Sequence, residues 1–388
     1  MFRTRRASLP RMYPRVMTAM AISGLLGCGS SSSDGNAGTG GNAGNAGSGT
    51  GAMAGSGGNG AAAGSGGSGA TGGGGSGTGG SGATGGGGTG GASNIETLAD
   101  VYEVNQFALG KSDVFFTGPV FNAAADDTGG VFRVAKTGGA PQKLADHKEL
   151  TVGLGVDDTS VYYITFDYVA ASGTARMYKV AHTGGSPIQV DEAKNLSIEG
   201  PGAAVLVRGG SAYWYANSGI RKVTGNSGAP FGQGAIALHT ADATHLYGAA
   251  TAGFSPTGVL QRMSLSTGVV EDLATGLRRP TDVALSASTA FWVELGLQND
   301  QKDGALHSVD KAGGASTPVV SPLASSNAIA SDGTTLFFTA GSSEIMKLPT
   351  TGGTPTPLAK SNVYVEQLEV DTSHVYFRTF NELKRVAK

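Results

Sequence analysis

The sequence SDGTTLFFTAGSSEIMKLPTTGGTPTPLAK, residues 331–360, contains one clear copy of a pattern that recurs along the chain. An aromatic strand, Leu336-Phe337-Phe338, comes first. A second strand carries the basic–apolar pair Lys347-Leu348 and ends at a glycine turn, Thr351-Gly352-Gly353. A third short strand, Thr356-Pro357-Leu358, follows that turn. Because glycine supplies the positive φ that tight hairpins need, the stretch predicts consecutive antiparallel strands.

The aromatic strand recurs seven times at a regular interval. Its copies are Val114-Phe115-Phe116, Val161-Tyr162-Tyr163, Ala212-Tyr213-Trp214, Leu246-Tyr247, Ala290-Phe291-Trp292, Leu336-Phe337-Phe338 and Val375-Tyr376-Phe377. Their first residues lie 34 to 51 positions apart, with a mean of about 43. A repeat of this length is typical of propeller blades.

The other parts of the pattern recur with the aromatic strand. The basic–apolar pair and its equivalents are Arg133-Val134, Lys179-Val180, Lys222-Val223, Arg262-Met263, Ser308-Val309, Lys347-Leu348 and Arg385-Val386. Glycine turns follow most of them, with weaker copies at Ser227-Gly228 and Thr267-Gly268. An aspartate often stands four residues before the aromatic strand, at Asp157, Asp242, Asp332 and Asp371, where its side chain can bond its own backbone.

Each unit therefore has four short antiparallel strands, and no stretch shows a convincing long helical period. The last unit ends at Lys388 after its third strand. Thr97-Leu98-Ala99 is similar to Pro357-Leu358-Ala359, so residues 95–100 are predicted to supply the missing fourth strand of the blade formed by residues 366–388. This arrangement closes a ring.

The folded region, residues 94–388, resembles β-propeller proteins of the YWTD, NHL and virginiamycin B lyase-like kind. The resemblance implies an all-β fold, a single propeller of about seven four-stranded blades closed by the N-terminal strand. The YWTD tetrapeptide is degraded to Phe115-Phe116-Thr117-Gly118 or Phe291-Trp292-Val293-Glu294. The alternative is a six-bladed ring with one irregular unit near residue 212 or 246.

The N-terminus has the features of a lipoprotein signal peptide, residues 1–27. A basic segment is followed by an apolar run of about twelve residues that is too short to span a bilayer. It ends in Leu25-Leu26-Gly27-Cys28, which resembles the bacterial lipobox and implies lipidation, for example by palmitate, at Cys28. Gly29 lacks the aspartate of an inner-membrane retention signal, which favours the outer membrane or cell surface. The alternative is a plain secretory signal.

Residues 28–93 are predicted to form a disordered tether after the lipidated cysteine. They consist almost wholly of Gly, Ser, Ala, Thr and Asn, so they have nothing to bury that would offset the entropy of ordering. A flexible chain of this length has a root-mean-square reach on the order of 45 Å. The tether would hold the propeller away from a membrane.

Charge and composition exclude several kinds of partner. Removal of the five arginines before Cys28 changes the net charge from −2 to −7, which does not suit nucleic-acid binding. Cys28 is the only cysteine, so no disulfide can form within the chain. The six histidines are scattered without metal-ligand spacing, and no metal or cofactor is predicted. We expect a monomeric propeller.

Function is expected on the face that carries the connectors between blades, because variable loops on a rigid scaffold are where binding normally sits. Length varies in residues 118–130, 167–175, 191–201, 250–258, 276–281 and 296–304. The candidate residues near the central channel mouth on this face are Asn105, Glu149, Glu199, Arg278, Arg279, Asp282, Asn327 and Glu366. The alternative for each is a solvated loop or a strand-end hydrogen bond.

Three functions are compatible with these features. The first is a membrane-anchored extracytoplasmic binding module for an unknown protein or glycan. The second is a propeller enzyme, a lyase, lactonase or glycan-acting enzyme, which would need acids such as Glu199, Asp282 and Glu366 to converge. The third is a scaffold subunit of an outer-membrane assembly, which an exposed apolar patch would favour. The sequence has no catalytic motif, such as G-x-S-x-G, so no catalytic residue is assigned.

Overall fold

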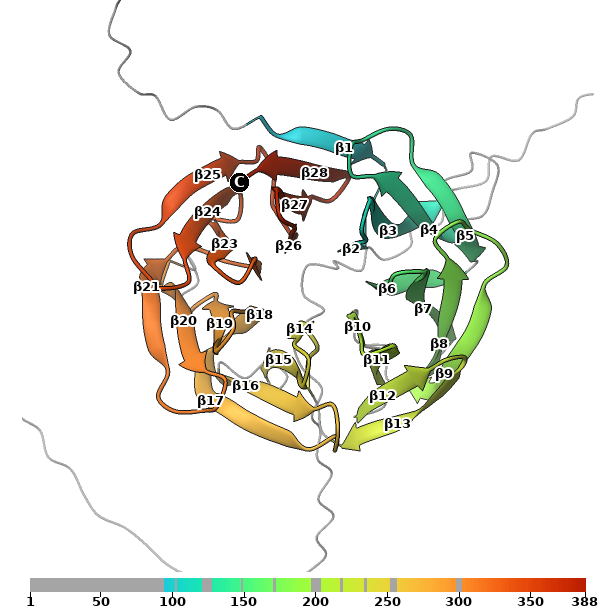
Figure 1. The fold of residues 1–388 in the computed structure, drawn as a ribbon, viewed down its shortest axis with the longest axis horizontal. Helices are drawn as coiled ribbons and strands as arrows, with labels where there is room; N and C mark the ends of the chain where they lie inside the picture. The colour runs from blue at the N-terminus through green and yellow to red at the C-terminus, as the bar shows by residue number, and fades with distance from the viewer. Residues whose placement is uncertain are drawn as a thin grey trace, which may run out of the picture. The chain divides into compact units, whose positions relative to one another are not determined.

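The computed structural model describes residues 94–388 apart from 102, 121–127, 148, 170–171, 197–203, 217–218, 234–235, 252–256 and 298–301. These residues form seven four-stranded antiparallel sheets arranged as blades around a ring (Figure 1), and they contain no helix. The predicted seven-bladed β-propeller is confirmed. The six-bladed alternative is wrong, because the units near residues 212 and 246 each form a complete sheet.

Each blade is a meander whose first strand lies nearest the axis and whose fourth lies at the rim (Figure 1). Blade 1 contains β2 (Gln106–Leu109), β3 (Asp113–Val120), β4 (Thr128–Ala135) and β5 (Gln142–His147). Blade 2 contains β6 (Leu150–Val156), β7 (Ser160–Val169), β8 (Ser172–Ala181) and β9 (Ile188–Leu196). Blade 3 contains β10 (Val205–Arg208), β11 (Ser211–Ala216), β12 (Gly219–Thr224) and β13 (Ser227–Gln233).

The remaining blades repeat this order. Blade 4 contains β14 (Thr240–Ala241), β15 (His245–Thr251), β16 (Thr257–Ser264) and β17 (Val270–Arg278). Blade 5 contains β18 (Pro280–Leu285), β19 (Thr289–Glu294), β20 (Gly304–Asp310) and β21 (Thr317–Leu323). Blade 6 contains β22 (Ile329–Ser331), β23 (Thr335–Ala340), β24 (Glu344–Pro349) and β25 (Thr356–Lys360). Blade 7 contains β26 (Gln367–Val370), β27 (His374–Arg378), β28 (Glu382–Ala387) and β1 (Glu96–Asp100).

The ring closes as the sequence predicts. Strand β1 pairs antiparallel with β28, with Glu96 opposite Arg385 and Asp100 opposite Glu382. The N-terminal strand thus becomes the fourth strand of a blade whose other three strands lie almost 300 residues away. An ion pair between Glu96 and Arg385, at 2.6 Å, reinforces this pairing.

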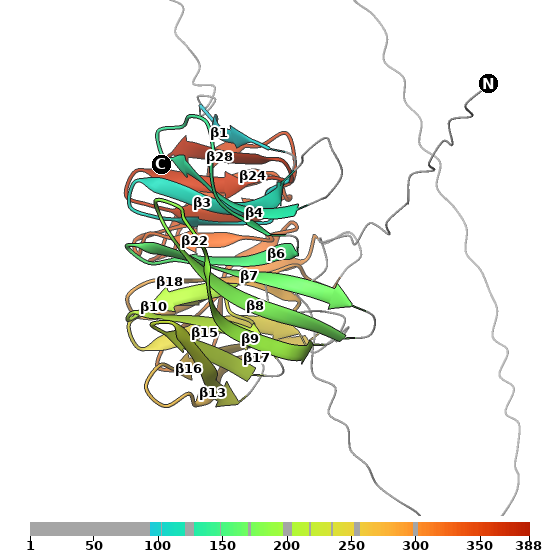
Figure 2. The ribbon, with the colours of Figure 1, turned by 90° about the vertical axis from the view of Figure 1, so that its right-hand side faces the viewer.

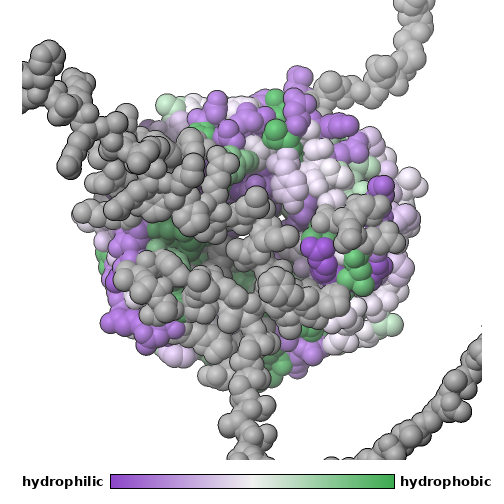
Figure 3. Space-filling model, turned by 180° about the vertical axis from the view of Figure 1, so that it is seen from behind, coloured by the Kyte–Doolittle hydropathy of each residue, from purple (hydrophilic) through white to green (hydrophobic). Residues whose placement is uncertain are grey.

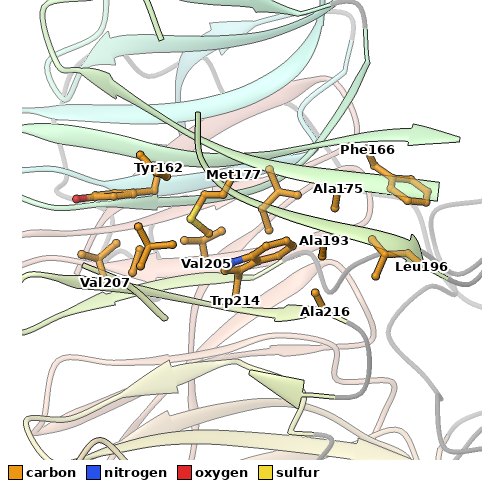
Figure 4. Packing of buried hydrophobic residues seen from close by; sticks show 14 residues of the cluster. Tyr162, Phe166, Ala175, Met177, Ala193, Leu196, Val205, Val207, Trp214 and Ala216 are labelled. Carbon is orange, nitrogen blue, oxygen red and sulfur yellow. The ribbon is translucent and has the colours of Figure 1, made fainter. Parts of the chain in front are cut away.

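The aromatic strands are the second strands of the blades and form the core between them. Every residue of the seven aromatic copies is at most 3% exposed. Figure 4 shows how neighbouring blades interdigitate, with Tyr162 and Met177 of blade 2 packed against Val205 and Trp214 of blade 3. Full burial of one such side chain contributes about 1.5–3 kcal/mol, so blade-to-blade packing supplies most of the driving force.

The predicted aspartate turns occur between the first and second strands. In blade 7, one oxygen of Asp371 accepts backbone N–H groups of Ser373 and His374, each at 2.9 Å, and the other accepts the hydroxyl of Tyr376 at 3.0 Å. Burial alone would raise the pKa of Asp371, but these hydrogen bonds and the charge of Lys136 hold it well below the ordinary value. The carboxylate is therefore ionised, and both of its oxygens accept hydrogen bonds within the fold.

The same turns carry a brace between neighbouring blades. Arg385 of blade 7 donates to the carbonyl of Lys136 in blade 1, and the Lys136 ammonium returns to Asp371 of blade 7 at 2.9 Å. Blades 4 and 5 repeat both bonds through Arg262, Lys311 and Asp242. Single bonds of the brace join other pairs, from Arg133 to the carbonyl of His182 at 2.9 Å and from Lys388 to Asp332 at 2.7 Å. In three blades the basic residue of the basic–apolar pair, Arg133, Arg262 or Arg385, thus links one blade to the next.

One predicted turn is in the wrong place. Ser227-Gly228 lies inside β13, and the turn of blade 3 falls at Gly225, whose φ is 64°. Gly228 is required for another reason, because a Cβ there would lie 2.0 Å from Cγ of the buried Asp191. Asp191 accepts from the indole of Trp214 at 2.9 Å and from the guanidinium of Arg221 at 2.5 Å. The glycine makes room for a buried ion pair between blades 2 and 3.

The two ends of the ring differ in their connectors. The turn face carries the aspartate turns and the glycine turns. The loop face carries the connectors between the second and third strands of each blade and those between blades. Figure 2 shows the ring from the side, with β7 and β8 reaching farthest toward the loop face, and Figure 3 shows that face with hydrophobic and hydrophilic residues side by side.

Loss of the brace at the closure is expected to destabilise the ring. Lys136→Met leaves the Asp371 carboxylate, only 20% exposed, without its cation and should lower the free energy of unfolding by about 1–3 kcal/mol in urea titrations. Lys143→Met is the matched control, because Lys143 and its partner Asp146 are 45% and 54% exposed. It should cost less than about 1 kcal/mol. Equal losses in the two variants would contradict a role for the brace.

Candidate functional site

Five of the predicted site residues lie on connectors from the fourth strand of one blade to the first strand of the next: Asn105, Glu149, Arg279, Asn327 and Glu366. All of these connectors belong to the loop face. Arg278 is the last residue of β17, and Asp282 lies inside β18. Glu199 lies outside the described residues. The described residues are spread around the ring, and most of them contact the framework.

Asp282 ties three blades together. Its Oδ1 lies 3.0 Å from Nδ1 of His239 in blade 4, and its Oδ2 accepts the backbone N–H of Ile329 in blade 6 at 3.0 Å. Gln367 has the same role at the interface of blades 7 and 1, where its amide donates to the carbonyl of Phe107 at 2.8 Å. A side chain of the first strand thus satisfies the free edge of the next blade's first strand.

Glu366 forms an ion pair with Arg378, whose guanidinium also donates to the carbonyl of Val104 at 2.8 Å. Glu103 lies beside this pair. Burial raises the pKa of Glu103, the negative charge of Glu366 raises it further, and Arg378 partly offsets the rise. Two carboxylates therefore share one guanidinium at the junction of blades 7 and 1.

Glu149 lies between an imidazole and a guanidinium at the junction of blades 1 and 2. Its oxygens are 3.8 Å from Nδ1 of His147 and 3.8 Å from a guanidinium nitrogen of Arg176. His147 also bonds the hydroxyl of the fully buried Tyr163. Burial lowers the pKa of His147, although Glu149 opposes this shift, and burial raises the pKa of Tyr163 above its ordinary value.

The other predicted residues bond nearby backbone or side-chain groups of the framework. Asn105 donates to the carbonyl of Thr151 at 3.2 Å, and Asn327 donates through its side chain to the carbonyl of Ser325 at 3.4 Å. Arg278 pairs with Asp303. Arg279 has a φ of 57°, and its carbonyl accepts the N–H of Leu295 at 3.1 Å. These contacts fit strand-end roles, the alternative that the sequence left open.

Sequence reasoning missed Glu369, which lies in the inner strand β26. Its surface is half-buried. Burial and then the charge of Asp282 raise the pKa of Glu369 to about 7, against smaller opposing effects of Gln367 and Arg208. The register gives a signal that could have found it. The six residues that occupy the same position in the other blades are uncharged: Ala108, Gly155, Leu206, Thr240, Ala284 and Ala330.

Exposed large hydrophobic side chains gather on the loop face. Seven such side chains occur among the described residues. Two lie on the turn-face side, Ile188 and Val269. Five lie on the loop face: Leu150, Leu297, Val363, Tyr364 and Phe380. Five of these seven side chains therefore lie on the face that carries the variable connectors.

Within the residues that the structure describes, no three His, Cys, Asp or Glu side chains cluster as metal ligands do. The same residues include no helix that is both long enough and apolar enough to cross a bilayer. Asp282 and Glu366, the described acids of the enzyme hypothesis, engage different partners, His239 and Arg378.

The fold defines the chain as a seven-bladed β-propeller. No protein-family profile matches its sequence, and no curated protein matches it. Similar solved structures include YCF48 bound to D1 peptide, with a TM-score of 0.53 and 10% identity over 76% of this chain and 95% of that one. The WD40 β-propeller domain of Doa1 has a TM-score of 0.51 and 8% identity over 76% and 97%. The propeller domain of the Trilobed protease from Pyrococcus furiosus has a TM-score of 0.51 and 10% identity over 74% and 93%. At these identities the similarity shows the fold alone.

Glu369 is expected to make stability depend on pH. Its pKa of about 7 in the folded chain exceeds the value of about 4.3 in the unfolded chain. The wild type therefore loses stability as the pH rises through this interval, and Glu369→Gln does not. The variant should be close to wild type at about pH 4 and more stable by about 1–3 kcal/mol at about pH 8 in urea unfolding.

The matched control is Asp158→Asn in an exposed turn, whose effect should not change over this range. A constant difference between Glu369→Gln and wild type would show that the carboxyl titrates normally.

Proposed function

We propose that this protein is a lipid-anchored extracytoplasmic interaction module whose propeller binds a partner through its loop face. One observation carries the proposal, the gathering of exposed large hydrophobic side chains on that face. The turn face is occupied by aspartate turns and braces that hold the blades together. The loop face is the end of the ring on which side chains remain for a partner.

A protein or peptide partner fits these side chains better than a glycan. Tyr364 and Phe380 are 45% and 54% exposed, and aromatic residues are enriched among the anchors of protein interfaces. YCF48 was solved with the D1 peptide bound, so at least one propeller of similar fold binds a peptide. The apolar side chains also suit the second candidate, a scaffold subunit of an envelope assembly.

The anchor and tether would place this face away from a membrane. The segment Leu25-Leu26-Gly27-Cys28 supports lipidation at Cys28, and the absence of aspartate at Gly29 supports the outer membrane or cell surface. The glycine-rich residues 29–93 supply a reach on the order of 45 Å. A reach of this kind lets a binding module search the surroundings of its anchor.

Lipidation is expected to depend on Cys28. Cells that express the full chain and receive an alkyne fatty acid should label the wild type and carry it in the membrane fraction. Cys28→Ala should lose both the label and the membrane association, because several acyl chains are needed for firm anchoring. Ser30→Ala is the control and should behave as wild type. Membrane-bound, labelled Cys28→Ala protein would contradict the anchor.

Contact through the loop face is expected to appear in photocrosslinking in cells. A photoreactive amino acid at Leu150 or Leu297, which are 58% and 46% exposed, should give crosslinked products. The same amino acid at Ile188 or Val269, which are 50% and 56% exposed on the turn-face side, should give none. Crosslinks to one protein would indicate a specific partner, and crosslinks to several subunits of one assembly would favour the scaffold. Products at all four positions, or at none, would contradict a binding role for the loop face.

A further inference from the structure

The structure points to one region of the loop face as a site for a basic partner. At the outer end of blade 7, where the ring closes, six side chains form a surface that is named the seam surface: Asp100, Glu103, Tyr364, Glu366, Phe380 and Glu382. We propose that the seam surface binds a segment of a partner protein in which lysine or arginine stands next to an apolar side chain. The inference rests on the proposed function and names the chemistry of its partner.

The connector from β1 to β2 is held here against two segments that lie more than 250 residues later in the sequence. The connector from β1 to β2 lies on the turn between β27 and β28, since the N–H groups of Val101 and Val104 donate to the carbonyls of Asn381 and Phe380, each at 2.9 Å. Arg378 fastens the same connector from below through the carbonyl of Val104 at 2.8 Å. The backbone of the seam surface is therefore fixed before a partner arrives, which lowers the entropic cost of binding.

The third segment adds apolar area. It connects β25 to β26, and the backbone N–H of Glu366 donates to the carbonyl of Arg378 in β27 at 3.0 Å. Val363 and Tyr364 stand out from this segment with exposures of 50% and 45%, and Phe380 stands out from the neighbouring turn at 54%. Three of the five exposed hydrophobic side chains of the loop face thus belong to a single blade.

The carboxylates of the seam surface outnumber the cations that reach them. Asp100 lies directly opposite Glu382 in the β1–β28 ladder, and like charges in that position destabilise a sheet. Glu382 is paired with Lys384 at 2.9 Å, but neither Asp100 nor Glu103 forms an ion pair among the described residues. Asp100 and Glu103 are therefore carboxylates that a bound cation could pair with.

Negative charge is also in excess around Glu366, which lies nearer the axis of the ring than Asp100 and Glu382. Glu366 already engages Arg378, and its charge acts on the neighbouring Glu103. The exposed ring of Tyr364 lies close enough to Glu366 for that carboxylate to raise the pKa of its phenol, after the larger effect of burial. Carboxylates beside an aromatic face are the groups that bind an ammonium or a guanidinium, through ion pairing and cation–π attraction.

Other exposed hydrophobic residues of the loop face lack this surplus of negative charge. Leu150 adjoins Glu149, which lies 3.8 Å from Arg176 and from His147. Leu297 donates its N–H to Asp303, which is already paired with Arg278. The combination of exposed aromatic rings with unmatched carboxylates thus selects blade 7.

The test is a selection of random heptapeptides displayed on phage against the purified full chain. We expect the selected peptides to carry at least one lysine or arginine beside an aromatic or aliphatic residue. Synthetic copies should bind at least tenfold more weakly to a seam variant, Asp100→Asn with Glu103→Gln, Tyr364→Ala and Phe380→Ala. Their affinity should also fall between about 50 mM and about 500 mM NaCl, because salt screens exposed charges.

The matched control is Asp158→Asn with Val269→Ala, which removes a charge and an exposed apolar side chain on the turn-face side. It should bind the peptides as wild type does, and urea unfolding should show that both variants are folded. Acidic or uncharged consensus peptides, binding unaffected by the seam variant, or preference for neutral oligosaccharides over the peptides would overturn the inference. Those outcomes leave the proposed function standing wherever crosslinks at Leu150 or Leu297 are found, so the two failures are distinguishable.

Discussion

The structure depends on a carboxylate that serves two blades at once. In the turn between the first and second strands, one oxygen of an aspartate such as Asp371 satisfies the backbone of its own turn, and the other accepts a tyrosine and the lysine of the next blade. A turn bond or a surface ion pair alone is weak. Here the carboxylate is already oriented by its own turn, so the lysine meets a fixed partner and loses less entropy in pairing. A second bond runs from Arg385 of blade 7 to the carbonyl of Lys136 in blade 1. Both bonds therefore cross the interface between blades 7 and 1, where the ring closes.

This constraint explains why the two faces of the ring differ. Bonds between blades at the turn face require a fixed turn length, so the glycine turns there are short and repeat with similar positive φ angles, as at Gly352 and Gly353. The connectors of the loop face carry fewer repeated bonds. They vary in length and hold exposed side chains such as Phe380 without disturbing the register of the strands. In such a propeller the turn face holds the blades together, and the side chains of the loop face can vary without disturbing the strands.

The repeat and its closure could be predicted from the sequence, because they depend on local signals. Aromatic strands, glycine turns and, in four units, the aspartate before the aromatic strand recur in the same order along the chain. Strand β1 resembles the fourth strands of other blades, and it pairs with β28. The turn predicted at Ser227-Gly228 is wrong. Gly228 is needed instead because any side chain at that position would clash with Asp191, a residue of the neighbouring blade. The sequence also does not show that Asp282 and Glu366 are paired within the fold. A carboxylate at the start of a strand looks free until the structure shows that His239 or Arg378 occupies it.

The charged side chains available to a partner are therefore those that no group within the fold already pairs with. Asp282 bonds two neighbouring blades, and Glu149 lies between His147 and the guanidinium of Arg176. At the closure the balance of charge differs, because two strands from opposite ends of the chain bring Asp100 and Glu382 face to face. A uniform repeat offers no such juxtaposition. The seam is the place where the repeat is broken, because its blade is completed by a strand from the other end of the domain. A closure strand of this kind gives a symmetric fold a single, distinct position at which a partner can be recognised.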